Sequence, residues 1–180
     1  FVNYWLQNEH LLVESQKMSK SEGNFYTLRQ LLEMGYSPES LRYTLISTHY
    51  RQKLNFTFDK IKSSQKCVNK LRELKRRTEL ITLNACKEGE DIESASTQML
   101  EKFKEKLSDD LNISGALGEL FIWVNDMFSA LDNKQVRLSD AKIILSTLNS
   151  VDSILCVIDD SNDTRDSGEI DGLILARNDA

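Results

Sequence analysis

The stretch KMSKSEGN, residues 17–24, contains the side chains of this 180-residue chain that are best suited to phosphate chemistry. Lys17 and Lys20 lie three positions apart, among the hydroxyl groups of Ser19 and Ser21. A lysine ammonium is a mobile point charge for phosphate oxygens, and a strand–loop–helix junction supplies N–H donors. The stretch therefore indicates a phosphate-binding loop, although a K-x-x-K-S string taken alone also fits an ordinary solvated turn.

The residues around the lysines predict how they are positioned. HLLVE, 10–14, is a short apolar run that suits a strand. Residues 15–24 are polar without an apolar period, which predicts a loop, and Gly23 gives its backbone freedom. Met18 is almost its only apolar anchor. Such a loop could close over a nucleotide and open again.

Two short helices are predicted after the loop. Thr27 can cap the first, with Gln30 at the position that completes a capping box. Gly35 should end that helix. Ser37 caps the next one, and Pro38 occupies its first position, where a missing N–H does no harm.

Four longer amphipathic helices should follow, with short links between them. We expect the first from about 57 to 83, after which a polar break covers NACKEGEDIES, 84–94. The second carries Met99 to Leu107, the third follows SDDLNIS at 108–114, and Ser139 caps the fourth, which extends to Ile158. Their apolar stripes can be buried only against each other, so the fold class is mainly α and 61–158 is an antiparallel helical bundle.

Composition sets the broad class of protein. Hydrophobic residues make up 40% and charged residues 28%, which is typical of a globular chain. No apolar run approaches the ~18 residues that cross a bilayer, so we expect no membrane contact. The opening FVNYWLQNEH has neither the start of a secretory signal nor a methionine, and we expect a segment of a longer polypeptide.

The three cysteines, Cys67, Cys86 and Cys156, are scattered and form no CxxC pair. Clustered ligands would be needed for zinc, so we expect no metal site in this chain. Reduced thiols of a cytoplasmic protein explain them.

Charge is unevenly distributed around a net value of −5. Residues 60–77 hold eight Lys or Arg and one acid, and Lys62, Lys66, Lys70 and Arg77 fall close together on the predicted helix. This face could be merely solvated, or it could contact phosphates. Residues 159–171 hold six acids and one base, which indicates a linker or a disordered tail.

Several spaced motifs carry a family resemblance. KMSKS is complete and is followed by Gly23 and Asn24, and LRYTLISTHYRQKLNFT follows at 41–57. These residues resemble the second signature of class I aminoacyl-tRNA synthetases, and residues 4–57 are similar to cysteinyl-tRNA synthetases in particular. SDDLNISGALGELF, 108–121, is similar to that family's DD-FNTP-A---LF stretch. The resemblance is close over 1–60 and follows the pattern over 60–158; Asn112-Ile113-Ser114 and Glu22 depart from it.

The resemblance implies four regions. Residues 1–25 would end a Rossmann-type catalytic domain, and 26–60 would form the stem-contact segment. Residues 61–158 would be a tRNA-binding, DALR-like bundle. Residues 159–180 would link to a truncated C-terminal anticodon-binding region. The chain contains no HIGH-type sequence and no zinc-ligand set, so we expect an internal or clipped piece that is inactive alone.

The implied activity is a two-step ligation. The carboxylate of cysteine attacks the α-phosphate of ATP, pyrophosphate leaves, and cysteine passes to the terminal adenosine of tRNA(Cys). Lys20 would neutralise the departing phosphates with support from Lys17. The implied ATP site comprises Lys17, Met18, Ser19, Lys20 and Ser21. Mg²⁺ would accompany ATP, and Zn²⁺ would belong to the N-terminal catalytic part that this chain lacks.

The implied tRNA surface adds Arg51 to Lys62, Lys66, Lys70 and Arg77. Arg51 could contact tRNA or stabilise the junction between catalytic part and bundle; we expect His49 to be structural and both tryptophans, Trp5 and Trp123, to be core. The family further implies a monomer. Two alternatives stay open: the ligase that joins cysteine to an amino-sugar in mycothiol synthesis, and a non-catalytic helical RNA-binding module.

Overall fold

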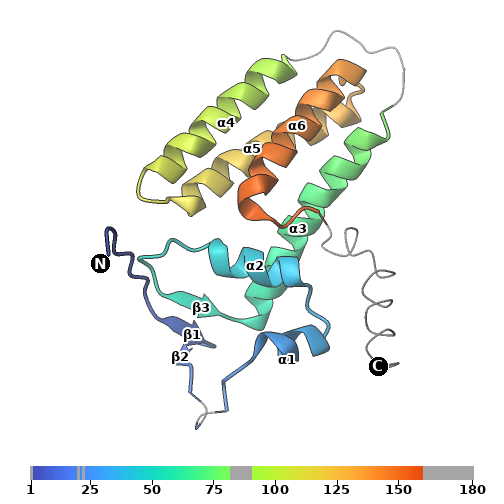
Figure 1. The fold of residues 1–180 in the computed structure, drawn as a ribbon. Coiled ribbons are helices and arrows are strands. Elements are labelled where there is room, and N and C mark those ends of the chain that lie inside the picture. Colours follow the sequence, from blue (N-terminus) through green and yellow to red (C-terminus); the bar gives the residue numbers. More distant parts are fainter. Residues whose placement is uncertain (1, 20, 22, 82–90, 160–180) are drawn as a thin grey trace, which may run out of the picture.

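The computed structural model describes residues 2–19, 21, 23–81 and 91–159. Figure 1 shows a small sheet with short helices at one end of the molecule and a helical bundle at the other. The elements are β1 (Leu11–Val13), β2 (Gln16–Lys17), α1 (Leu28–Glu33), α2 (Pro38–Ile46), β3 (Leu54–Phe56), α3 (Phe58–Glu79), α4 (Ile92–Ser108), α5 (Ile113–Asp132) and α6 (Leu138–Leu155). The mainly α prediction is confirmed, and α3 runs through both parts.

The sheet has the order β2-β1-β3, with β1 antiparallel to β2 and parallel to β3. The predicted strand within 10–14 is confirmed as β1. The prediction that 15–24 is entirely loop is wrong for 16–17, which pair with β1 as β2. Backbone N–H and C=O groups make this pairing, so a polar stretch can join a free strand edge whatever its side chains are.

The predicted caps of the two short helices are confirmed. Thr27 accepts a hydrogen bond from the backbone of Gln30, and the Gln30 side chain completes the capping box. Gly35 follows the helix at φ +89°, a conformation that glycine adopts without a Cβ penalty. Ser37 caps α2, with Pro38 as its first residue.

Two apolar cores match the two parts of the molecule. The larger core lies between α3, α4, α5 and α6, as the apolar stripes predicted. It includes Trp123, which is 3% exposed and donates to the Ser96 hydroxyl over 3.1 Å. The smaller core joins the sheet to the short helices and to the start of α3. It consists of Val13, Leu31, Leu41, Phe56 and Ile61.

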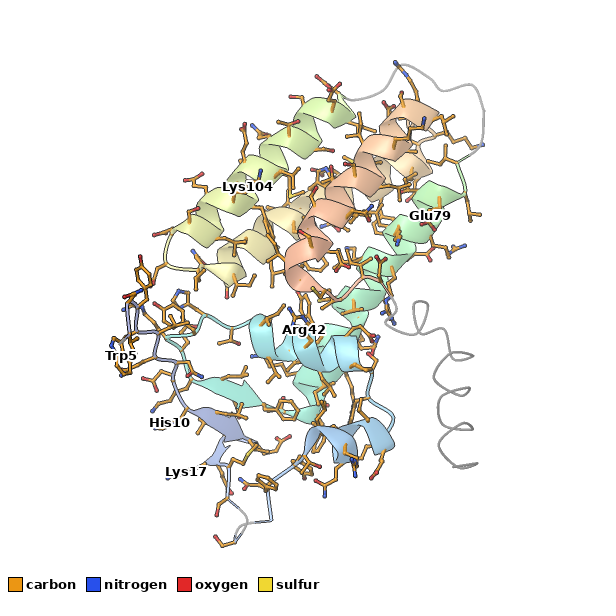
Figure 2. All side chains as sticks on the ribbon, viewed as in Figure 1. Trp5, His10, Lys17, Arg42, Glu79 and Lys104 are labelled. Carbon is orange, nitrogen blue, oxygen red and sulfur yellow. The ribbon has the colours of Figure 1, made fainter. Side chains whose placement is uncertain are left out.

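Trp5 contradicts the prediction that it is core. Its side chain is 80% exposed, and it packs into neither apolar cluster. The segment ahead of β1 forms no helix or strand among the described residues, so it has no apolar face that packing would bury. Figure 2 shows Trp5 at the edge of the molecule.

Several helix ends differ from the predictions. α3 ends at Glu79 rather than near 83, and the polar break lies mostly in 82–90, outside the described residues. Ser139 is not the cap of α6, because the helix begins at Leu138 with Arg137 as its N-cap. The carboxylate of Asp140 accepts the Arg137 N–H over 2.9 Å and so satisfies one backbone donor at that end.

The other end of α6 comes before Ile158, which was expected inside the helix. Cys156 is left-handed at φ +53° and stops the helix after Leu155. The carboxylate of Asp152 then accepts the N–H of Val157 over 2.8 Å and that of Ile158 over 2.9 Å. The acidic stretch beyond residue 159, and the apolar pattern after it, lie outside the described residues.

Within the described part of the chain, none of the helices combines the length and the apolar character that crossing a bilayer requires.

Candidate functional site

The KMSKS loop begins on β2, and the side chain of Met18 anchors it to the smaller core. Lys17 is exposed on the strand, whereas Met18 is half-buried against the smaller core. An apolar cavity of about 170 Å³ lies beside it. Its walls are Leu11, Met18, Tyr26, Leu28, Leu31, Leu41, Leu45 and Phe56. Met18 therefore supplies the apolar attachment that the sequence predicted.

Asn24 closes the loop across its base. Its Oδ1 accepts the backbone N–H of Ser19 over 2.8 Å, and its Nδ2 donates to the carbonyl oxygen of Lys17 over 3.0 Å. The Ser19 and Ser21 hydroxyls share a 2.7 Å hydrogen bond. In the sequence, Asn24 stands out only as part of a motif. An Asn after Gly in a polar loop is the signal for this bridge, because its side chain readily forms hydrogen bonds with nearby backbone.

The hairpin that carries Lys17 is held in a costly conformation. Glu14 and Ser15 form its two-residue turn at φ +48° and +66°, and left-handed backbone costs a non-glycine residue about 1–2 kcal/mol. Asn55 on β3 offsets this by accepting the Ser15 N–H over 2.8 Å and donating to the Ser15 hydroxyl over 3.1 Å. The Glu14 carboxylate accepts the Phe58 N–H over 3.2 Å. These long-range bonds tie the loop to the start of α3.

Lys20 and Glu22 lie outside the described residues. The other predicted ATP-site residues, Lys17, Met18, Ser19 and Ser21, share the one loop. Figure 2 shows Lys17 at the end of the molecule that is farthest from α4.

The HYR segment, His49 to Arg51, meets the turn between α4 and α5. The Tyr50 hydroxyl donates to Asp110 Oδ1 over 2.5 Å, and Arg51 Nε pairs with Asp110 Oδ2 at 2.8 Å. Tyr50 and then Arg51 hold the pKa of the Asp110 carboxyl below its usual value, and the same cluster raises the pKa of Arg51. His49 Nε2 lies 2.8 Å from the Asp110 carbonyl oxygen, as expected of a structural histidine. Arg51 thus lies at the junction.

The four predicted tRNA contacts on α3 share one helix but differ in their surroundings. Lys62 pairs with Asp59 at 3.3 Å, and Arg77 pairs with Asp132 of α5 at 2.5 Å. The remaining two are Lys70, which donates to Asn125 over 2.5 Å, and the exposed Lys66. No described side chain forms an ion pair or hydrogen bond with the Lys66 ammonium, so this charge is the most available to a phosphate.

An aromatic ring lies beneath part of this face. Lys70 and Arg77 lie 5.9 and 5.5 Å from the ring centroid of Phe128, within cation–π range. Other basic residues of 60–77 have internal roles that the sequence did not reveal. Lys60 donates to Thr48 over 2.9 Å and burial lowers its pKa, while Arg72 donates to the Ile158 carbonyl over 2.9 Å.

Among the described residues, no group of three or more His, Cys, Asp or Glu side chains could hold a metal ion.

Comparison with known proteins shows what this chain is similar to. Residues 1–66 match the model of the class I (C) tRNA synthetase catalytic domain. A cysteine–tRNA ligase of Brachyspira hyodysenteriae is 42% identical over 98% of this chain and 38% of its own length. Those of Chlamydia caviae and Koribacter versatilis are 36% and 40% identical over 98% and 94% of this chain, covering 37% and 33% of their lengths. The chain thus spans less than two fifths of these relatives, and over that span it is similar to cysteine–tRNA ligases.

Proposed function

We propose that the full-length protein ligates cysteine to tRNA(Cys) through cysteinyl-adenylate, with ATP as the energy source. The observation that carries this is the KMSKS sequence at 17–21, in which Asn24 bridges the backbone of Lys17 and Ser19, in a chain 42% identical to a cysteine–tRNA ligase over 98% of its length. Cysteine's carboxylate attacks the α-phosphorus, the bond to the bridging oxygen breaks, and pyrophosphate leaves with the electron pair.

The lysines of the loop act on the leaving group. Negative charge grows on the departing β- and γ-phosphates, so an ammonium that meets them best in the transition state lowers the barrier. We assign this role to Lys20 and a supporting role to Lys17, whose side chain is exposed while its carbonyl is fixed by Asn24. Met18 anchors the loop, and Ser19 and Ser21 supply hydroxyl donors when their mutual bond opens.

Each of the four regions of the chain then has its own role. Residues 1–25 end the catalytic domain, 26–60 form the stem-contact segment, 61–158 form the bundle, and 159–180 lead into the anticodon-binding region. The two cores support only the boundary near residue 60, because the smaller core combines residues of 1–25 and 26–60 while the larger core lies mostly within 61–158.

The tRNA lies along α3 and is positioned by phosphate contacts, which carry no base information. Lys66 contributes most, because it is exposed and has no competing partner among the described residues. Lys62, Lys70 and Arg77 contribute less, since each must leave an acid or an amide. Arg51 acts through the junction.

ATP enters as its Mg²⁺ complex. The described residues do not fit a zinc site, so no step here uses one; the Zn²⁺ that the family implies is assigned to the rest of the full-length protein. We further propose a cytoplasmic monomer.

The decisive assay gives purified full-length protein cysteine, ATP and either tRNA or the amino-sugar acceptor of mycothiol synthesis. We expect cysteine to appear on tRNA only. Transfer to the amino-sugar would replace this proposal with the other ligase. RNA binding without any cysteine-dependent ATP–pyrophosphate exchange would replace it with a non-catalytic module.

A further inference from the structure

Besides the packing of Tyr43 and Ile46 of α2 against the bundle core and the bond from the Ser114 hydroxyl to the Ser47 carbonyl, three attachments join the bundle to the sheet end of the molecule. The first is α3, which belongs to both parts (Figure 1). The second is Arg42 of α2, whose Nε donates to the Leu155 carbonyl oxygen at the end of α6 over 2.5 Å. The third is the turn between α4 and α5, where Asp110 meets Tyr50 and Arg51.

Asp110 is the centre of the third attachment. Its two carboxylate oxygens are both engaged: Oδ1 accepts from Tyr50 over 2.5 Å and from Arg51 Nη2 over 3.2 Å, and Oδ2 faces Arg51 Nε at 2.8 Å. Its carbonyl oxygen lies 2.8 Å from His49 Nε2, and the His49 and Tyr50 rings stack at 4.8 Å. One residue therefore contacts three consecutive residues of the other part.

The turn presents Asp110 in a fixed direction. Asp110 and Leu111 are both left-handed, at φ +51° and +55°. Asn112 closes the turn by donating its N–H to the carbonyls of Lys106 and Asp109 over 3.1 Å, and its side chain caps α5. A turn that keeps two non-glycine residues in this region must be held by its surroundings, and such positions recur where a precise geometry is needed.

Three attachments that do not share one axis are needed to fix one rigid body on another. With α3 as the only link, the bundle could pivot about the long axis of α3. The Arg42 contact lies close to α3, because α2 packs against α3. The α4–α5 turn lies on the opposite side of the bundle from α3 in Figure 1, so a contact there opposes such a pivot.

We propose that Asp110 is a positioning residue that holds the helical bundle at a fixed angle to the KMSKS segment, so that a tRNA lying on the bundle presents its end to the adenylate. This inference rests on the proposed function. Asp110 acts only through His49, Tyr50 and Arg51 and touches no substrate. It also explains why Arg51 is engaged inside the protein rather than open to a phosphate.

The kinetic test compares two half-reactions in the full-length protein. Asp110→Ala should lower kcat/KM for tRNA charging by roughly tenfold, because misplacement of about 1 Å far from the chemistry can cost up to ~10² in rate. Cysteine-dependent ATP–pyrophosphate exchange should change by less than twofold, because the ATP loop lies in the part that keeps its own core. Asp110→Asn keeps the left-handed turn, which asparagine tolerates, and should fall between parent and alanine.

Asp109→Asn is the matched control, since it removes the same charge one position away, and it should charge tRNA like the parent. Charging by Asp110→Ala within twofold of the parent would overturn the inference. Equal losses in exchange and charging would also overturn it, because they indicate general destabilisation.

A distance measurement tests the inference without any enzyme assay. Spin labels on a keto amino acid at the exposed positions 33 and 104 report the distance between α1 and α4, which changes when the bundle tilts against the sheet end. We expect a broader or shifted distance distribution in Asp110→Ala than in the parent and in Asp109→Asn. An unchanged distance distribution would refute the proposal that Asp110 fixes the orientation of the bundle. If the parent made no adenylate at all, the proposed function would fail. The distance measurement would still decide whether Asp110 fixes the orientation of the bundle.

Discussion

Asn24 donates its side-chain amide to the backbone carbonyl of Lys17 over 3.0 Å and so spans the loop from its last polar residue to its first lysine. The same side chain accepts the Ser19 N–H over 2.8 Å. The backbone on both sides of Met18 is therefore fixed before any ligand arrives. Such preorganisation lowers the cost of placing ammonium groups around a triphosphate.

Loss of this bridge should weaken ATP use. Each net hydrogen bond contributes about 1 kcal/mol, so Asn24→Ala removes ~2 kcal/mol and should lower kcat/KM for ATP roughly thirtyfold. Asn24→Asp keeps the acceptor for Ser19 but cannot donate to Lys17, so about fivefold is expected. Initial rates of ATP–pyrophosphate exchange across ATP concentrations measure both. Alanine and parent rates within twofold of each other would show that the bridge is dispensable.

The local part of the fold could be predicted from the sequence because its causes are local. Thr27 and Gln30 lie three residues apart and form the capping box unaided, and Ser37 with Pro38 does the same for α2. The helical stripes also predicted residues that meet inside the bundle, such as Met99 and Phe103, and the separate expectation that Trp123 is core is confirmed. In each case the spacing along the chain already contains the geometry.

The site depends on contacts that sequence spacing does not contain. Asn55 lies 40 residues from Ser15, and Asp110 lies 60 from Tyr50; only the assembled fold brings each pair together. Arg77 looks like a free cation in the sequence, but Asp132 of α5 lies beside it in the fold. The charge pattern of one helix cannot reveal acids that a neighbouring helix supplies.

The basic face of α3 should respond unevenly to charge reversal. Lys66→Glu should weaken tRNA binding more than Lys62→Glu does, because the Lys62 ammonium already pairs with Asp59 in the parent. The triple reversal of Lys62, Lys66 and Lys70 should reduce the slope of log K against log salt by roughly two to three, since each lost phosphate contact removes about one released ion.

Filter binding or fluorescence anisotropy at several salt concentrations gives these slopes. Lys104→Glu on α4 is the control, because it reverses an exposed charge on another helix (Figure 2). Parent-like affinity in the triple variant would exclude α3 from the interface.

Tyr43 should make the fold sensitive to alkaline pH. The ring is 7% exposed, and burial, with Cys67 as a second cause, raises the pKa of its hydroxyl above the ordinary value of 10.0. The folded state then holds this proton where the unfolded chain releases it. Stability from Tyr43 is present below about pH 10 and is lost as pH rises, by up to ~1.4 kcal/mol per pH unit.

Tyr43→Phe should therefore show a shallower loss of unfolding free energy between about pH 10 and 11.5 than the parent, measured by urea unfolding at each pH. Tyr4→Phe is the matched control, because that ring is 92% exposed. Parallel profiles for the parent and Tyr43→Phe would contradict the role of burial.

The 180 residues alone should not make cysteinyl-adenylate, because the chain covers only 33–38% of the length of its relatives. Purified residues 1–180 should show no cysteine-dependent ATP–pyrophosphate exchange above background. The full-length protein serves as the positive control. Exchange by the short chain would place the complete ATP and cysteine sites within it.

Lys20→Ala in the full-length protein tests the central claim most directly, with ATP–pyrophosphate exchange as the measurement. Losing one preorganised contact to developing charge costs ~3–4 kcal/mol, so exchange should fall by roughly 10²–10³. Lys104→Ala, an exposed lysine on α4, should leave it unchanged. Exchange by Lys20→Ala within about threefold of the parent would contradict the account.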